Sequence, residues 1–229
     1  MILALFMYTF TDHWQSRSKI KGRTYPQRGV QQMEGFIRRV VTGHDKNGRS
    51  IIISDGLTPT IGTNPLRPGF RSTDIWRTND SPALITQQEP DPTLVPYTMR
   101  PGPCGTVIRV SEIAPESEEG DIYSLPPDQV HEMFRRIGSE AASTFGRGSS
   151  YPFMHRTETV DYAFVIEGEI TLLLDDQEVL LKAGDAAVQR GTNHGWINRS
   201  DKVCRILFIL CDGRFDSELA QLFGTASSH

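Results

Sequence analysis

The amino-acid sequence predicts an all-β fold whose strands close into a small barrel. Short apolar runs alternate with glycine-centred turns from Met154 to Asn198, and this spacing is typical of sandwiches and barrels. In only one longer segment do apolar residues recur with the period of an α-helix. The 229 residues, with 20 Gly and 14 Pro, suit one domain with extensions, because single β domains reach roughly 200–250 residues.

The first predicted strands form a hairpin. The β-rich runs 36–43 and 50–56 are joined by a loop that contains Asn-Gly, which is a strong hairpin signal. A short strand is predicted at 73–78 and a longer one at 105–115. The proline-rich stretch 79–103 between them is expected to be a loop, because proline cannot donate to a central sheet ladder.

One helix is predicted after Pro126, where apolar side chains recur with the period of a helical face. These apolar residues are Val130, Met133, Phe134, Ile137, Ala141 and Phe145. Gly146 is expected to end the helix. A single helix in a β-rich chain is expected to pack on the outside of the sheet.

The remaining chain is predicted to be strand after strand. One hairpin is expected to turn at Glu167-Gly168 and a second one near Ala183-Gly184-Asp185. A last buried strand is predicted at 204–213, and residues 217–223 are expected to form a short helix or turn. This order suits a small barrel, because each pair of strands can add to a closing sheet.

Four regions follow from these patterns. Residues 1–35 are expected to be a disordered or loosely packed tail, and residues 1–32 an upstream extension. Residues 36–150 would extend the barrel with strands, proline-rich loops and the helix. Residues 151–213 would form the barrel core, and residues 214–229 a C-terminal tail. Exposed strand edges favour a homodimer, because pairing covers their unpaired backbone groups.

Charge and cysteine content narrow the partners and the compartment. The formal net charge is −4, so no nucleic-acid partner is expected, although residues 1–50 are basic. The three cysteines form no C-x-x-C pair, which fits a reducing, cytoplasmic location. The apolar start spans ten residues, whereas a bilayer needs about 20, so no membrane span is expected.

Two histidines stand in a specific setting of glycines and polar residues. The setting consists of His155, Thr157, Asp161 and Gly168, and then Gly184, Gly191, His194 and Asn198. This arrangement resembles the two motifs of the cupin superfamily over about residues 150–212. Thr157 stands where a second His is common, Asp161 where Glu is common, and Gln189 where Pro is common. The resemblance implies a cupin (double-stranded β-helix, jelly-roll) barrel with an N-terminal strand extension and one outer helix.

The motif residues could hold a metal ion. Two neutral imidazoles and one carboxylate can bind a divalent metal and leave positions open for substrate, and His155, Asp161 and His194 supply that set. Cupins that bind metal tightly usually present three His and one Glu, and Thr157 is a poor ligand. The pattern does not distinguish Fe, Mn, Zn, Ni or Cu, and a site without cofactor is equally compatible with it.

The same residues could act without a metal. His155 and His194 could form an acid/base pair, with Asp161 orienting one imidazole and raising its basicity. Further side chains near the motifs are expected to bind a polar substrate. They are Thr157, Tyr162, Gln189, Thr192, Trp196 and Asn198. Such a site suits isomerisation, dehydration, cyclisation or decarboxylation.

The run from His155 to Ser200 is also similar to small cupins that accompany polyketide-type natural-product pathways and are described as cupin-domain oxidoreductases. This resemblance implies a small-molecule enzyme of secondary metabolism, with oxidoreductase activity on oxygenated aromatic or polyketide-like molecules. Two alternatives stay open. One is a metal-free isomerase, dehydratase, cyclase or decarboxylase, and the other is a non-catalytic cupin that binds a small ligand.

Overall fold

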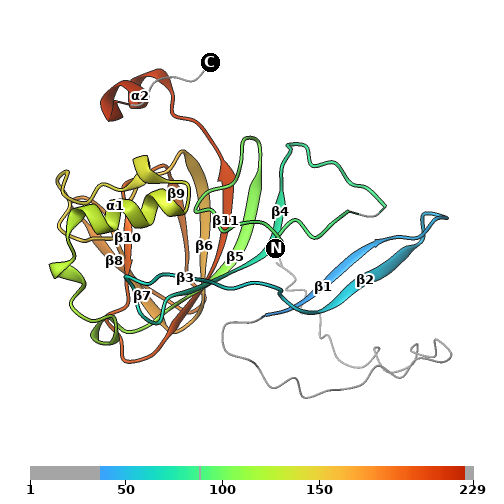
Figure 1. Cartoon of the computed structure of the whole chain (residues 1–229), viewed down its shortest axis with the longest axis horizontal. Coiled ribbons are helices and arrows are strands. Elements are labelled where there is room, and N and C mark those ends of the chain that lie inside the picture. Colours follow the sequence, from blue (N-terminus) through green and yellow to red (C-terminus); the bar gives the residue numbers. More distant parts are fainter. Residues whose placement is uncertain (1–36, 88, 225–229) are drawn as a thin grey trace, which may run out of the picture. The chain divides into compact units, whose positions relative to one another are not determined.

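A computed structural model describes residues 37–87 and 89–224, so the tail expected at 1–35 lies outside the described residues. The described chain is mostly strand, with two α-helices (Figure 1). The strands are β1 (Arg38–His44), β2 (Ser50–Leu57), β3 (Gly62–Thr63), β4 (Arg71–Thr78), β5 (Thr106–Ile113), β6 (Thr159–Glu167), β7 (Glu169–Leu173), β8 (Glu178–Lys182), β9 (Ala186–Arg190), β10 (Gly195–Ile197) and β11 (Cys204–Asp212). The helices are α1 (Pro127–Arg136) and α2 (Ser217–Phe223), with short 3-10 turns at Glu116–Glu118, Ile122–Ser124 and Glu140–Ala142.

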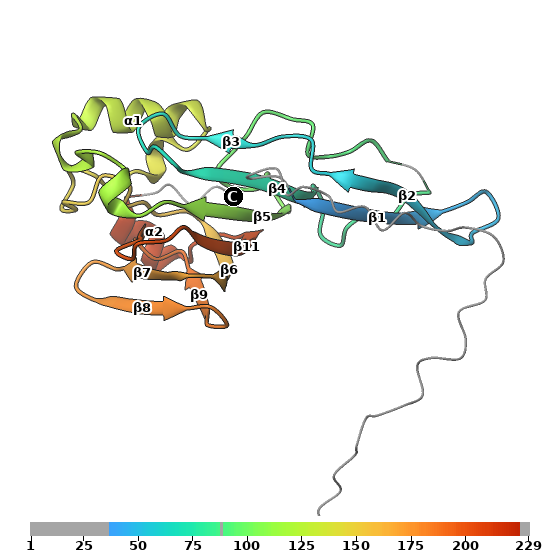
Figure 2. The same ribbon diagram turned by 90° about the horizontal axis from the view of Figure 1, so that it is seen from below.

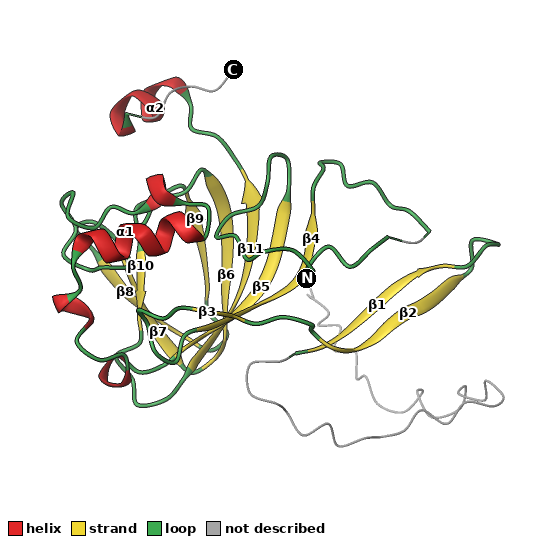
Figure 3. Cartoon of the chain, in the orientation of Figure 1, coloured by secondary structure: helices red, strands yellow, loops and turns green. Residues whose placement is uncertain are grey.

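Two sheets form the barrel. A six-stranded sheet has the order β3-β4-β5-β11-β6-β9, and a three-stranded sheet has the order β10-β7-β8 (Figure 3). Strands β7 and β8 lie in a separate layer from β4 and β5 (Figure 2). Val165 and Ile206 of the larger sheet pack in one buried cluster with Ile170 and Leu172 of the smaller sheet. The all-β jelly-roll prediction is therefore confirmed.

The two hairpins predicted at the centre of the motif segment are wrong. Strand β6 pairs with β9 and β11, whereas β7 pairs with β8 and β10. The chain therefore crosses between sheets at Gly168, whose φ is 76°, and again between β8 and β9. A Cβ at Gly168 would lie 2.9 Å from the Val203 carbonyl oxygen. Local turn chemistry marks a turn, but which strands pair depends on tertiary packing.

The hairpin predicted near the N-terminus is confirmed. Strands β1 and β2 pair antiparallel, and Gly48 in their turn has a φ of 75°. The strands predicted at 73–78 and 105–115 correspond to β4 and β5, which extend the larger sheet from β11. Within the described residues of 79–103 there is no strand.

Helix α1 is shorter than the apolar period predicts. It ends at Arg136, because Gly138 follows with a φ of 68° and breaks the helical path. Phe145 still packs in one buried cluster with Val130 and Phe134, so the apolar period reports a shared core rather than one continuous helix. The helix lies outside the two sheets, beside the segment that follows β3 (Figure 2).

The described part of the chain contains no helix with the length and apolar character that a bilayer crossing requires. The upstream extension expected at residues 1–32 lies outside the described residues.

Candidate functional site

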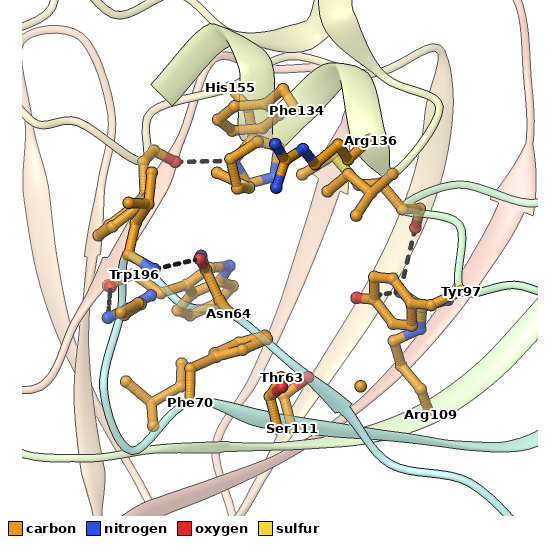
Figure 4. A pocket seen from close by; sticks show the side chains of 18 of the residues that line it. Thr63, Asn64, Phe70, Tyr97, Arg109, Ser111, Phe134, Arg136, His155 and Trp196 are labelled. Atoms are coloured by element: carbon orange, nitrogen blue, oxygen red, sulfur yellow. Dashed lines mark hydrogen bonds between the residues drawn. The ribbon is translucent and has the colours of Figure 1, made fainter. Parts of the chain in front are cut away.

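The barrel contains a partly open cavity of about 520 Å³, within the range of roughly 300–1,000 Å³ that small-molecule sites occupy. The barrel strands supply one part of its wall, and helix α1 and two segments outside the motifs supply the rest. Aromatic side chains approach the cavity from several sides (Figure 4). These are Phe70, Tyr97, Phe134, Phe153, Trp196 and Phe208.

The two motif histidines lie side by side in this cavity. His155 and His194 form an isolated antiparallel bridge, in which each backbone N–H donates to the carbonyl oxygen of the other residue at 2.9 Å. Their ring centroids are 4.2 Å apart. The prediction that residues far apart in sequence meet at one place is therefore confirmed for this pair.

Backbone carbonyls set the orientation of both imidazoles. Nδ1 of His155 lies 2.9 Å from the Phe153 carbonyl oxygen, and Nδ1 of His194 lies 2.9 Å from the Thr192 carbonyl oxygen. Because a carbonyl oxygen can only accept, each Nδ1 carries the proton and each Nε2 keeps a lone pair. Asp161 was expected to orient one imidazole, and these carbonyls take that role instead.

Burial keeps both imidazoles neutral. Burial, together with the nearby Arg67 guanidinium, lowers the pKa of His155 to about 4, although the hydrogen bond to the Phe153 carbonyl opposes the shift. Burial also lowers the pKa of His194 well below its usual value, and His155 adds to the effect. Desolvation disfavours the charged form of an imidazole. At neutral pH each ring is therefore a hydrogen-bond acceptor through Nε2.

Asp161 and Gln189 form a cross-strand pair between β6 and β9 on the cavity wall. Asp161 is 4% exposed and Gln189 is 3% exposed. Asp161 Oδ1 and both polar side-chain atoms of Gln189 have no hydrogen-bond partner in the protein. Burial raises the pKa of Asp161 to about 6, although a hydrogen bond from Thr159 and the charge of Arg109 oppose the shift.

The donor set does not match a three-ligand metal site. Within residues 37–87 and 89–224, no three His, Cys, Asp or Glu side chains are grouped so that they could hold a metal ion. His155 and His194 are together, but Asp161 does not complete a metal-binding set with them. The metal role expected for these three residues stays a prediction, and the chemistry below is derived from the side chains themselves.

Two residues expected to bind substrate have internal partners instead. Asn198 is 0% exposed, and its amide donates to the carbonyl oxygens of Ile113 and Lys202. Asn198 therefore ties β10 to neighbouring segments. The hydroxyl of Thr157 bonds the hydroxyl of Thr159 at 2.8 Å. Neither Asn198 nor Thr157 lines the cavity.

Two further expected residues lie away from the cavity. Tyr162 follows Asp161 on β6 and is 41% exposed, because successive side chains of a strand point to opposite faces. Thr192 is exposed and contributes only its carbonyl oxygen, which accepts from His194. Of the residues expected to bind substrate, Gln189 and Trp196 line the cavity.

A buried arginine was missed as part of the site. Arg109 on β5 lies 3.1 Å from Asp74 and donates to the hydroxyl of Tyr97 and the carbonyl oxygens of Thr98 and Met99. It thereby holds the segment that forms one cavity wall (Figure 4). An arginine within an otherwise apolar strand was the available signal, since arginine is almost never fully buried unless paired.

A second arginine supports the opposite side. Arg67 donates to Glu119 at 2.5 Å and to the Trp196 carbonyl oxygen at 2.8 Å. Its guanidinium also lies over the ring of Phe153, 5.2 Å from the centroid. No motif marked Arg67, because the loop after β3 has no regular pattern.

The jelly-roll sheets and the histidine-lined cavity define a barrel protein with a cavity lined by polar and aromatic side chains. Residues 143–210 match the family described as "Cupin domain". The cupin resemblance of the motifs is therefore confirmed over residues 143–210.

Several relatives come from biosynthetic clusters. The chain is 29% identical over 182 residues to "Phomopsin biosynthesis cluster protein C'" of Diaporthe leptostromiformis, covering 77% of this chain and 78% of the relative. It is 28% identical over 207 residues to "Cupin-domain-containing oxidoreductase fogC" of Aspergillus ruber, covering 86% and 85%. Among solved structures, the Schizosaccharomyces pombe Cnp3 cupin domain aligns with a TM-score of 0.37 and 8% identity, covering 85% of this chain and 98% of that one.

Proposed function

We propose that this protein is a cupin enzyme that transfers protons on a small molecule bound in the barrel cavity, with Asp161 as the group that carries the proton. One observation supports this proposal above all. A buried carboxyl group with a pKa near 6 lines the same cavity as two neutral imidazoles. General acid/base catalysis is most efficient when the pKa of the catalytic group lies near the working pH.

The relative pKa values assign the roles. The pKa of Asp161 is about 6 and that of His155 about 4, so a proton released by the substrate moves to Asp161 rather than to an imidazole. Asp161 then returns the proton to another atom of the same molecule. The Nε2 atoms of His155 and His194 accept hydrogen bonds from substrate hydroxyls and hold the molecule in a fixed orientation relative to Asp161. The net reaction is an isomerisation, a cyclisation or a loss of water.

The test distinguishes proton transfer from oxidation. We would incubate the purified protein in D₂O with intermediates of the biosynthetic pathways to which its relatives belong, and analyse products by mass spectrometry. The proposal predicts a product at the oxidation level of the substrate, with deuterium bound to carbon where an exchangeable substrate hydroxyl supplied the proton. A product that has lost two hydrogens while keeping all its oxygens, or that has gained oxygen, would contradict it. Tight binding without any product would favour a non-catalytic ligand-binding protein.

An oxidoreductase is the second candidate. The observation that favours it is the printed name of several relatives, which are described as cupin-domain-containing oxidoreductases. The cupin domain and its relatives support a cupin enzyme broadly, and these names are the support for redox chemistry. Elemental analysis of protein purified without chelators, followed by an oxygen-consumption assay, tests this candidate. Stoichiometric metal that is lost in His155→Ala and His194→Ala would support it.

A further inference from the structure

Four polar side chains of the cavity wall, His155, Asp161, Gln189 and His194, offer more hydrogen-bond acceptors than donors. Asp161 Oδ1 and Gln189 Oε1 are buried and have no partner in the protein. The Nε2 atoms of His155 and His194 add two more acceptors, since each Nδ1 is bonded to a carbonyl. Among these four side chains, only the Gln189 amide nitrogen is an unpartnered donor. The number of unpartnered donors and acceptors stays the same if the oxygen and nitrogen of the Gln189 amide are interchanged, because neither atom has a partner.

The cavity arginines do not offset this excess. Nη1 and Nη2 of Arg109 donate to the hydroxyl of Tyr97 and to backbone carbonyls, and Nε lies 3.1 Å from Asp74 in an ion pair. Arg67 is paired with Glu119 and bonded to the Trp196 carbonyl. Buried pairs of this kind are committed to their partners, because separating them leaves an uncompensated charge.

Arg136, at the end of α1, is exposed and paired with Glu132 at 2.9 Å. Solvent screens charges that are this exposed, so Arg136 would add little to the binding of an anionic ligand. A ligand carboxylate or phosphate would therefore meet the acceptor-rich wall and the Asp161 carboxyl group without a free buried cation. The wall favours a ligand that is uncharged and rich in hydrogen-bond donors.

We propose that the cavity binds an uncharged, hydroxylated aromatic ketone, with Gln189 as the residue that recognises its carbonyl group. The Gln189 amide N–H donates to the ligand carbonyl oxygen. Ligand hydroxyls donate to Asp161 Oδ1, to Gln189 Oε1 and to the imidazole Nε2 atoms. The ring lies among the aromatic walls, where Phe70, Phe134 and Trp196 approach from different sides (Figure 4).

Burial gives Gln189 its selectivity. A buried amide without partners loses its hydrogen bonds to water on folding, and a matching ligand restores them. A ligand that lacks the matching groups leaves the amide unsatisfied, so the wall discriminates against it. The inference concerns the same cavity as the proposed function, but it needs binding only and no turnover.

The test uses three probes with one ring and one substitution pattern. They are 3,5-dihydroxyacetophenone, 3,5-dimethoxyacetophenone and 3,5-dihydroxybenzoate, titrated into the full chain at pH 7.5 by calorimetry. We expect the dihydroxy ketone to bind at least tenfold more tightly than the dimethoxy ketone, which has no donors, and than the benzoate, which is an anion. Equal affinities, or tightest binding of the benzoate, would overturn the proposal.

Two variants test Gln189 itself. Gln189→Leu removes both the amide N–H donors and the amide oxygen. Gln189→Glu keeps the shape of the side chain but removes the amide donors. Both variants are expected to bind the dihydroxy ketone at least tenfold more weakly than the wild type. The control Gln177→Leu changes an exposed glutamine in the turn between β7 and β8 and is expected to leave the affinity unchanged. Unchanged affinity in the folded Gln189→Glu variant would overturn the assignment.

Stability separates a ligand role from a structural one. Gln189→Leu is expected to raise the melting temperature of the ligand-free protein, because it removes buried polar atoms that have no partner. A lower melting temperature would show that Gln189 supports the fold, and would overturn its assignment. If the probes bind as expected but no substrate turns over, the proposed proton transfer fails while this inference stands.

Discussion

At the residue scale, the proposed chemistry depends on one carboxyl group. Asp161→Asn keeps the size and shape of the side chain but cannot take up a proton. We expect turnover to fall by about 10²–10⁴-fold, the usual contribution of a general acid or base, while the fold is retained. Assays with the matched control Asp176→Asn, an exposed residue in the turn after β7, should show wild-type rates. Equal turnover in Asp161→Asn would remove Asp161 from the mechanism.

The pH dependence follows from the same group. When Asp161 acts as the base, the active form is the carboxylate, and its pKa is about 6. We therefore expect kcat/KM to fall about tenfold per pH unit below pH 6 and to level off above it. The profile is measured with a non-titrating substrate. A rate that stays flat down to pH 4 would mean that the reacting carboxyl group is not Asp161.

At the scale of elements, the sequence predicts strands better than it predicts their partners. The period of two and the Asn-Gly turn identify β1 and β2, whose pairing is local. The turn at Gly168 is also visible in the sequence, but β6 and β7 belong to different sheets. A left-handed glycine fits either a hairpin or a crossing between sheets, so only the packing of the two layers decides. Helix α1 shows the same limit, because Phe145 packs in the same core as the residues of α1 but lies beyond the end of the helix.

The crossing at Gly168 can be tested by adding one methyl group. Gly168→Ala places a Cβ 2.9 Å from the Val203 carbonyl oxygen at a φ of 76°. Gly184→Ala adds the same group at a φ of 97°, with nothing within 4 Å. The left-handed backbone costs each variant about 1–2 kcal/mol, and only Gly168→Ala adds the clash. Chemical denaturation should show the larger loss for Gly168→Ala, and equal losses would contradict the sheet crossing.

At the scale of the whole molecule, the motif segment supplies only part of the cavity. His155, Asp161, Gln189, His194 and Trp196 could be predicted because the motif pattern marks them. The loop after β3, the segment at 97–99 and helix α1 complete the wall, and no local pattern points to their meeting. Their placement depends on buried long-range contacts of Arg67 and Arg109 with these segments and with β10. The homodimer expected from the sequence stays a prediction at this scale, and sedimentation at several concentrations tests it.

The buried charges also link stability to pH. The pKa of Asp161 is raised from 3.8 to about 6, so the folded state binds its proton more tightly. Stability therefore falls as the pH rises from about 4 to 6, by on the order of 2–3 kcal/mol in total, and the loss is complete above pH 6. Asp161→Asn should be more stable than the wild type at pH 7, and this advantage should shrink as the pH falls from 6 to 4. Denaturation at several pH values measures it, and a constant difference would contradict the raised pKa.

The two histidines change the pH dependence of stability in the opposite direction from Asp161. Folding lowers the pKa of His155 from 6.5 to about 4 and lowers that of His194 as well, so the unfolded state binds more protons. Wild-type stability should therefore fall as the pH drops from 6.5 towards 4, although Asp161 offsets part of the loss. His155→Asn removes one of these titrations and should flatten the fall in a thermal-unfolding series. An unchanged slope would mean that His155 titrates normally in the folded protein.

The central claim is that a buried carboxyl group, rather than an imidazole, carries the proton in this cavity. An NMR titration of the wild-type protein tests it directly, by following the Asp161 carboxyl carbon and the ring nitrogens of His155 and His194. The account predicts that Asp161 titrates near pH 6, and that both imidazoles at pH 5.5 are neutral with the proton on Nδ1. Titration of Asp161 near pH 4 and of the imidazoles near pH 6.5 would contradict it.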